Sequence, residues 1–149
     1  MSLPFELPME LQPFFGDEHF SSYPFVTIPQ SFHDDRGGIL NIADGHIGDV
    51  AHIFSRQGVV RANHYHDTDW HLTYLVNGSM HYTYCPLEDV DDTKLILVNA
   101  GQMIFSPQKI VHRMDFLEKC DMIAISRNSR KSEAYDLDTK RVEIEHKVH

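Results

Sequence analysis

The sequence predicts a single all-β domain, a sandwich or barrel of the jelly-roll kind. Its 149 residues suit one domain that can bury a sizeable core. From residue 25 onward, short runs rich in β-branched and aromatic side chains alternate with turn signals. No convincing amphipathic stripe of helical period appears before residue 130. Regular short strands without intervening helices are typical of sandwiches and barrels.

We divide the chain into an N-terminal arm (1–24), a barrel (25–126) and a charged C-terminal tail (127–149). The arm is rich in proline and aromatic residues and is expected to lie over the domain or over a partner subunit. The tail is compatible with loop, strand or a short helix. Turn residues such as Asn77-Gly78 and Pro107 separate the expected strands. These strands cover residues 25–28, 38–43, 50–56, 59–66, 70–76, 79–84, 94–98, 102–106, 112–117 and 121–126.

Composition excludes several classes of function. The formal net charge of −9 disfavours binding to nucleic acid, because an acidic surface repels phosphate backbones. No run of apolar residues approaches the roughly 20 that a membrane helix needs, and the proline-broken N-terminus does not resemble a signal peptide. Cys85 and Cys120 lack metal-site or disulfide spacing and are expected to be reduced thiols. We therefore expect a cytoplasmic protein without membrane or nucleic-acid partners.

Histidine is the unusual component, with 11 residues of 149. His64 and His66 are two apart on one expected strand, so they point to the same face. His71 heads the next strand, and His112 opens the strand that follows Pro107. Imidazole is the commonest metal ligand near neutral pH. Several imidazoles that converge from adjacent strands would suit zinc, iron, manganese, nickel or copper.

These stretches resemble the paired signatures of the cupin superfamily, the RmlC-like jelly rolls. The matching positions are Gly58, His64, His66, Gly78, Gly101, Pro107 and His112. Lys109 replaces the glycine of the second signature, and Phe116 replaces its asparagine. His71 stands where the family carries a glutamate ligand. The resemblance therefore implies a site of four histidines, with His64, His66, His71 and His112 as ligands of a divalent transition metal. Zinc is the first choice, iron, manganese or nickel are alternatives, and no organic cofactor is expected.

A second resemblance narrows the substrate class. HDDRGGIL (33–40) looks like the opening of the deoxysugar-nucleotide epimerases and 3,4-ketoisomerases, cupins that act on dTDP-4-keto-6-deoxyhexoses. The run IFSRQGVVRANHYH (53–66) is similar to these ketoisomerases and to the zinc-binding cupin domain of capsular-polysaccharide sugar reductases. The resemblance implies that Arg36 contacts a phosphate and that Arg61 and His52 line the substrate site. By strand alternation Arg61 faces outward unless a bulge intervenes at Ala62-Asn63.

Two mechanisms compete for the same histidines. Isomerisation or epimerisation of a keto sugar requires removal of a proton next to a carbonyl and stabilisation of the resulting enediolate. Without a metal, His64 and His66 act as acid and base. With a metal, the histidines hold a Lewis acid and another residue must be the base.

The leading hypothesis is an enzyme: a sugar-nucleotide isomerase or epimerase of surface-polysaccharide biosynthesis. One alternative is a metal-dependent dioxygenase or oxidoreductase that acts on a small molecule. Another is a non-catalytic cupin that binds a small molecule in the barrel. A homodimer is also expected, because an exposed sheet edge and a hydrophobic N-terminal arm favour cover by a partner subunit.

Overall fold

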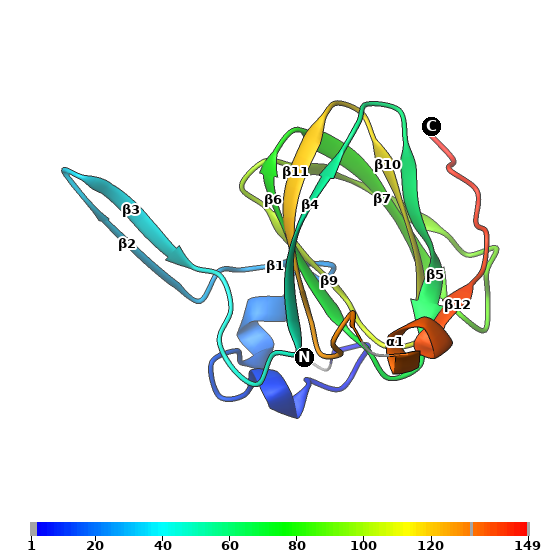
Figure 1. Ribbon diagram of the computed structural model, residues 1–149, viewed down its shortest axis with the longest axis horizontal. Coiled ribbons are helices and arrows are strands. Elements are labelled where there is room, and N and C mark those ends of the chain that lie inside the picture. Colours follow the sequence, from blue (N-terminus) through cyan, green and yellow to red (C-terminus); the bar gives the residue numbers. More distant parts are fainter. Residues whose placement is uncertain (1–2, 132, 149) are drawn as a thin grey trace.

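Two five-stranded antiparallel sheets face each other and form the barrel (Figure 1). The computed structural model describes residues 3–131 and 133–148. One sheet has the strand order β1-β9-β6-β11-β4, and the other has the order β12-β5-β10-β7-β8. The prediction of an all-β jelly roll is therefore confirmed.

Each of the ten predicted strands has a counterpart, and β2 and β12 are additional. The mostly polar sequence of β2 (residues 30–34) gives no strand signal. It forms a strand because β3 pairs with it. The strands are β1 (Phe25–Val26), β2 (Gln30–Asp34), β3 (Gly37–Asn41), β4 (Asp49–Ser55), β5 (Val60–His66), β6 (His71–Asn77), β7 (Ser79–Pro86), β8 (Lys94–Asn99), β9 (Met103–Ser106), β10 (Ile110–Phe116), β11 (Cys120–Ser126) and β12 (Thr139–Arg141). The helical elements are η1 (Met9–Leu11), η2 (Asp17–Phe20) and α1 (Glu133–Asp138).

The N-terminal segment contributes to the core of the barrel. Leu11, Phe15 and Phe20 are at most 1% exposed and belong to the same hydrophobic cluster as Trp70 and Phe105. Full burial of a large apolar side chain stabilises the fold by roughly 1.5–3 kcal/mol. This aromatic cluster therefore fixes residues 3–24 against one end of the barrel.

Strand β5 contains a bulge that changes which face its first residues present. Ala62 and Asn63 have positive φ angles of 67° and 59°. The pairing with β10 shifts at this point, so that His64 lies opposite His112 while Arg61 lies opposite Met114. Two steps along β10 thus match three steps along β5, which brings Arg61 to the same face as His64.

The C-terminal segment runs along the outer edge of β5. Strand β12 pairs with β5, with Thr139 opposite His66 and Arg141 opposite His64. Farther on, Ile144 is buried and its carbonyl accepts a hydrogen bond of 2.8 Å from Arg113. Helix α1 and β12 therefore lie beside the strand that carries two of the candidate histidines (Figure 1).

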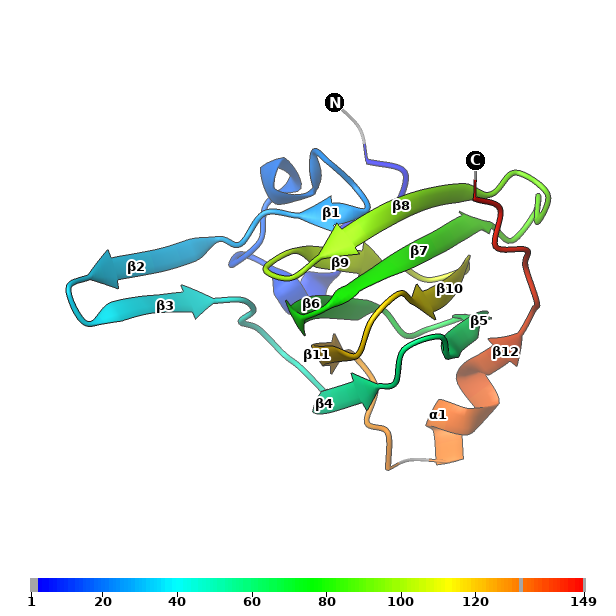
Figure 2. The ribbon, with the colours of Figure 1, turned by 90° about the horizontal axis from the view of Figure 1, so that it is seen from above.

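The β2–β3 hairpin projects away from the barrel (Figure 2). Nine of the ten residues in its two strands are exposed. They include Phe32, Ile39 and Leu40, which are 54%, 67% and 41% exposed. An isolated two-stranded hairpin is only marginally stable in water.

No helix in the described part of the chain is long and apolar enough to cross a membrane.

We predict that Lys109→Gly stabilises the protein. Lys109 is exposed and has a φ of 60°, a conformation that costs a non-glycine residue about 1 kcal/mol. The glycine of the second cupin signature falls at this position. Urea unfolding should show an increase in the free energy of unfolding of up to about 1 kcal/mol. Lys94→Gly, in the extended strand β8, is the control and should be destabilising. Equal losses in the two variants would contradict the assignment of strain to Lys109.

Candidate functional site

Four histidines from both sheets meet inside the barrel. His64 and His66 lie on β5, and His112 lies on the neighbouring strand β10. His71 lies on β6 in the opposite sheet. His66 and His112 are each 2% exposed, and His71 is 8% exposed. The interior alternation of the strands thus brings together the four candidate ligands predicted from the sequence.

The four rings form two overlapping groups. The ligand atoms of His64, His66 and His112 lie within 4.8 Å of one another. A second group, His66, Asp69 and His71, satisfies the same limit. The structure thus places His71 in a group with Asp69, and His66 belongs to both groups.

Hydrogen bonds orient two rings of the first group. Nδ1 of His112 lies 3.1 Å from the carbonyl oxygen of Ile110, so it must carry the proton. Nδ1 of His66 faces the Thr139 hydroxyl at 3.5 Å, while its Nε2 is buried and has no hydrogen-bond partner among residues 3–131 and 133–148. A buried nitrogen without a partner is costly unless it binds something. The neutral lone pairs of this group therefore fit a divalent transition metal.

Burial keeps these imidazoles neutral. Desolvation, followed by the charges of the neighbouring histidines, lowers the pKa of His64 from 6.5 to about 3. The same causes lower the pKa of His66 and hold that of His112 well below its ordinary value. At neutral pH the rings therefore offer lone pairs without first releasing protons.

His71 is held by a buried carboxylate. Its Nε2 donates a hydrogen bond of 2.9 Å to Oδ2 of Asp69, which is fully buried. The other oxygen of Asp69 accepts the backbone N–H of Asn128 at 3.0 Å. Burial by itself would raise the pKa of Asp69, but the hydrogen bond and charge of His71 and the bond from Asn128 together hold this pKa below its usual range. Because Nε2 carries the proton, Nδ1 is the basic atom of His71.

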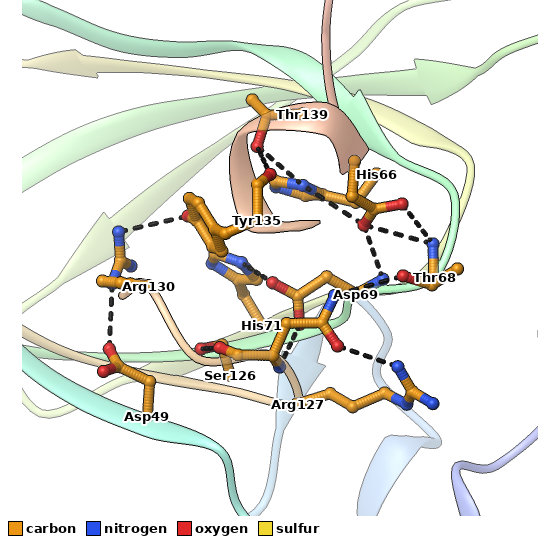
Figure 3. A network of polar contacts seen from close by, with 12 residues as sticks. Asp49, His66, Thr68, Asp69, His71, Ser126, Arg127, Arg130, Tyr135 and Thr139 are labelled. Carbon is orange, nitrogen blue, oxygen red and sulfur yellow. Dashed lines mark hydrogen bonds and ion pairs between the residues drawn. The ribbon is translucent and has the colours of Figure 1, made fainter. Parts of the chain in front are cut away.

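Side chains of the C-terminal segment cover the two histidines nearest to Asp69 (Figure 3). The centroid of the Tyr135 ring lies 6.0 Å from the centroid of the His66 ring and 6.3 Å from that of the His71 ring. Arg130 donates to the Tyr135 hydroxyl at 3.1 Å and pairs with Asp49 at 3.0 Å. Tyr135 is thereby fixed over the histidines.

Arg61 lies at the other end of β5. Its guanidinium donates to Oγ of Ser55 at 2.8 Å and to the carbonyl of Phe54 at 3.2 Å. It lines a groove of about 750 Å³ together with Arg56 and Lys119. Within residues 3–131 and 133–148, none of these three cations forms an ion pair. A chain with a net charge of −9 thus has unpaired positive charge in this groove.

The structure does not bring the other two predicted substrate contacts to the histidines. His52 is on the outer face of β4, where it pairs with Asp121 at 3.0 Å, because Ile53 takes the inward position. Arg36 lies at the turn of the projecting hairpin and donates to Asp34 at 2.9 Å. Its side chain is 85% exposed.

Sequence reasoning missed Asp69, Tyr135 and Asp138. Asp69 stands two residues before His71, and that spacing is the only signal in the sequence for its role. Asp138 and Tyr135 lie in the charged tail, far along the chain from the histidines that they approach.

No family model and no curated protein matches this sequence. Solved structures do match. Capsular polysaccharide assembling protein CapF from Staphylococcus aureus is 22% identical, with a TM-score of 0.58 over 82% of this chain. This chain covers 35% of CapF, about a third of its length.

Two smaller proteins are also similar. The dTDP-4-dehydrorhamnose 3,5-epimerase from Sulfolobus tokodaii is 20% identical, with a TM-score of 0.59 over 71% of this chain and 70% of the epimerase. QdtA, a sugar 3,4-ketoisomerase from Thermoanaerobacterium thermosaccharolyticum solved with TDP, is 18% identical, with a TM-score of 0.61 over 75% of this chain and 82% of QdtA. At these identities the likeness establishes the fold alone, a jelly roll of the cupin type.

We predict that the metal-free protein loses stability as the pH falls below 6.5. The unfolded chain protonates its histidines near pH 6.5, whereas buried His64 stays neutral until about pH 3. Each such histidine lowers the free energy of unfolding by about 1.4 kcal/mol per pH unit within this window. Urea unfolding at a series of pH values measures the slope. His112→Gln should reduce this slope by the contribution of one buried histidine. His33→Gln, in the exposed hairpin, should leave the slope unchanged. Equal slopes in both variants would contradict the buried neutral cluster.

Proposed function

We propose that this cupin moves a proton at the carbon next to the carbonyl of a nucleotide-linked 4-keto-6-deoxy sugar, as an isomerase or epimerase. The observation that carries the proposal is a buried group of neutral imidazoles beside a histidine held by a carboxylate. Solved structures of the same fold support the substrate class, since QdtA was crystallised with TDP and, as a single-residue mutant, with TDP-4-keto-6-deoxyglucose. Surface-polysaccharide biosynthesis in the cytoplasm is the setting that we propose.

His64, His66 and His112 would hold the metal, with zinc as the first choice. The buried Nε2 of His66, which has no hydrogen-bond partner in the described part of the chain, is the observation that supports the fit. When bound, a divalent ion there supplies a Lewis acid for the carbonyl oxygen and the enediolate. The sequence-based set also counts His71 as a ligand. The hydrogen bond from His71 to Asp69 favours a role for His71 other than metal binding. In the metal-free alternative, His64 and His66 remain the acid and base.

His71 is the base in this proposal. Nδ1 accepts the proton from the carbon next to the carbonyl, and the electron pair of the broken C–H bond moves into the enediolate. The carboxylate of Asp69 stabilises the imidazolium that forms and keeps the ring in one orientation. Return of the proton to the other face of the same carbon completes epimerisation. In isomerisation, the hydroxyl proton of the enediolate passes to the former carbonyl oxygen, and the proton from His71 returns to the former carbonyl carbon.

Arg61 is the proposed contact for the diphosphate. The bulge in β5 turns it to the face that carries His64, two ladder positions away. Its guanidinium matches the geometry of phosphate oxygens, and Arg56 and Lys119 add positive charge to the same groove. This local charge would offset the repulsion between an anionic substrate and the acidic chain.

The proposed function is tested by solvent exchange. In D₂O, the protein should introduce deuterium next to the carbonyl of dTDP-4-keto-6-deoxyglucose, as detected by mass spectrometry. His71→Gln should lower the rate about 10²–10⁴-fold while the metal is retained, as expected for loss of a general base. His112→Gln should neither bind the metal nor introduce deuterium into the sugar. His52→Gln, on the outer face of β4, is the matched control and should exchange normally.

Absence of exchange would contradict the proposal. Iron-dependent oxygen uptake would then favour a dioxygenase, and tight binding without turnover would favour a non-catalytic cupin.

We further propose a homodimer in which the β2–β3 hairpin packs on the partner subunit. The exposed apolar side chains of Phe32, Ile39 and Leu40 favour such cover. The hairpin also carries Arg36 away from its own barrel, so that a phosphate contact by Arg36 would require a site in the partner subunit.

Sedimentation at micromolar concentration should give a dimer. The double variant Phe32→Ser/Ile39→Ser should give a monomer, because it removes apolar surface from the hairpin. Leu137→Ser is the control, since Leu137 is 74% exposed on α1 and should not affect assembly. A monomeric wild-type protein would contradict the proposed dimer.

A further inference from the structure

The turn between β5 and β6 is bound to a carboxylate that comes from the other end of the sequence. Oδ1 of Asp138 accepts the backbone N–H groups of Asp67 at 3.2 Å and Thr68 at 3.0 Å. Oδ2 accepts those of Thr68 at 3.2 Å and Asp69 at 3.0 Å. Successive N–H groups that converge on one anion form a backbone nest. Asp138 therefore fills the nest of the turn that joins the two histidine strands.

Asp138 is 9% exposed, so its charge is largely removed from water. A buried carboxylate is tolerated when several donors satisfy it, and bonds to a charged acceptor are stronger than neutral ones. The side chain also lies 4.0 Å from Nδ1 of His66. The end of α1 is thus fixed in the site by Asp138, not only by the pairing of β12.

The turn that Asp138 binds orients Asp69. The N–H of Asp69 is bonded to Asp138, and Oδ1 of Asp69 is bonded to the N–H of Asn128. With the backbone and one carboxylate oxygen fixed, Oδ2 is directed at Nε2 of His71, 2.9 Å away (Figure 3). A further bond of 3.1 Å from the Asn128 side chain to Oγ1 of Thr68 closes this network.

We infer that Asp138 is a positioning residue for the reaction: it sets the turn that aims Asp69 at His71. This inference rests on the proposed function, in which His71 takes the proton. Asp138 itself touches no reacting atom and acts through Asp69. Through Asp138, the last residue of α1, the C-terminal segment therefore contributes to the geometry of the proposed site.

Asp138→Asn tests the inference, since the amide group that replaces one oxygen would face a backbone N–H donor instead of accepting from it. The matched control is Asp136→Asn, which makes the same charge change at an exposed position of the same helix. The zinc-loaded proteins are compared by NMR of the His71 ring N–H, by thermal unfolding, and by the solvent-exchange rate with dTDP-4-keto-6-deoxyglucose.

In D138N we expect the His71 ring N–H signal to shift or to broaden by exchange with water. We expect kcat for exchange to fall about 10-fold or more with little change in KM, as is usual when an outer-shell partner is lost. D136N should match the wild type in both. In an Asp69→Asn background, D138N should lower the rate no further, because it acts through Asp69.

The inference is overturned if the His71 signal and the exchange rate in D138N equal those of D136N. It is also overturned if D138N lowers the rate equally with and without Asp69. Should D138N not fold, Asp138→Glu is measured in its place against the same outcomes, because the added methylene displaces the turn while the charge is kept. The NMR signal requires no substrate. If the wild type shows no exchange, the proposed function is refuted, and the comparison of the His71 signal in D138N and D136N still decides whether Asp138 positions the ring.

Discussion

Burial of several imidazoles between two apolar sheets is the constraint on which the rest of the site depends. A protonated ring in that interior would lack both water and a full complement of anions, so His64, His66 and His112 are neutral at neutral pH. The lone pairs of neutral rings that face one another require an electrophile or a hydrogen-bond donor. Within the described chain, Nε2 of His66 has no such partner. A divalent metal is the simplest group that meets it.

The histidines of the candidate site come from both sheets. The sheet that contains β5 and β10 supplies the group of three histidines, and the opposite sheet supplies His71. Asp69 and Asp138, both buried, connect the two through the turn between β5 and β6. The C-terminal segment thus belongs to the site by its hydrogen bonds as much as by its position. In the proposed function this arrangement removes the conflict between coordination and proton transfer, because metal binding and proton transfer are assigned to different rings.

Features of short range could be predicted from the sequence. Period-two alternation indicated the shared face of His64 and His66, and turn residues indicated ten of the strands. The bulge at Ala62-Asn63 was a stated condition for Arg61 to face inward, and the structure contains it. Asp138 could not be predicted, because a carboxylate that bonds to a turn about 70 residues earlier leaves no periodic signal. Strand β2 was missed for a related reason, since its polar residues form a strand only through pairing with β3.

The most direct measurement is elemental analysis of the purified protein combined with anomalous X-ray scattering at the edge of the metal that it contains. We predict about one transition-metal ion per chain, bound to the imidazole nitrogens of His64, His66 and His112, and a sharp loss of metal in His112→Ala. Fully active protein without metal, or an ion bound elsewhere with these three histidines free, would contradict the metal site proposed here.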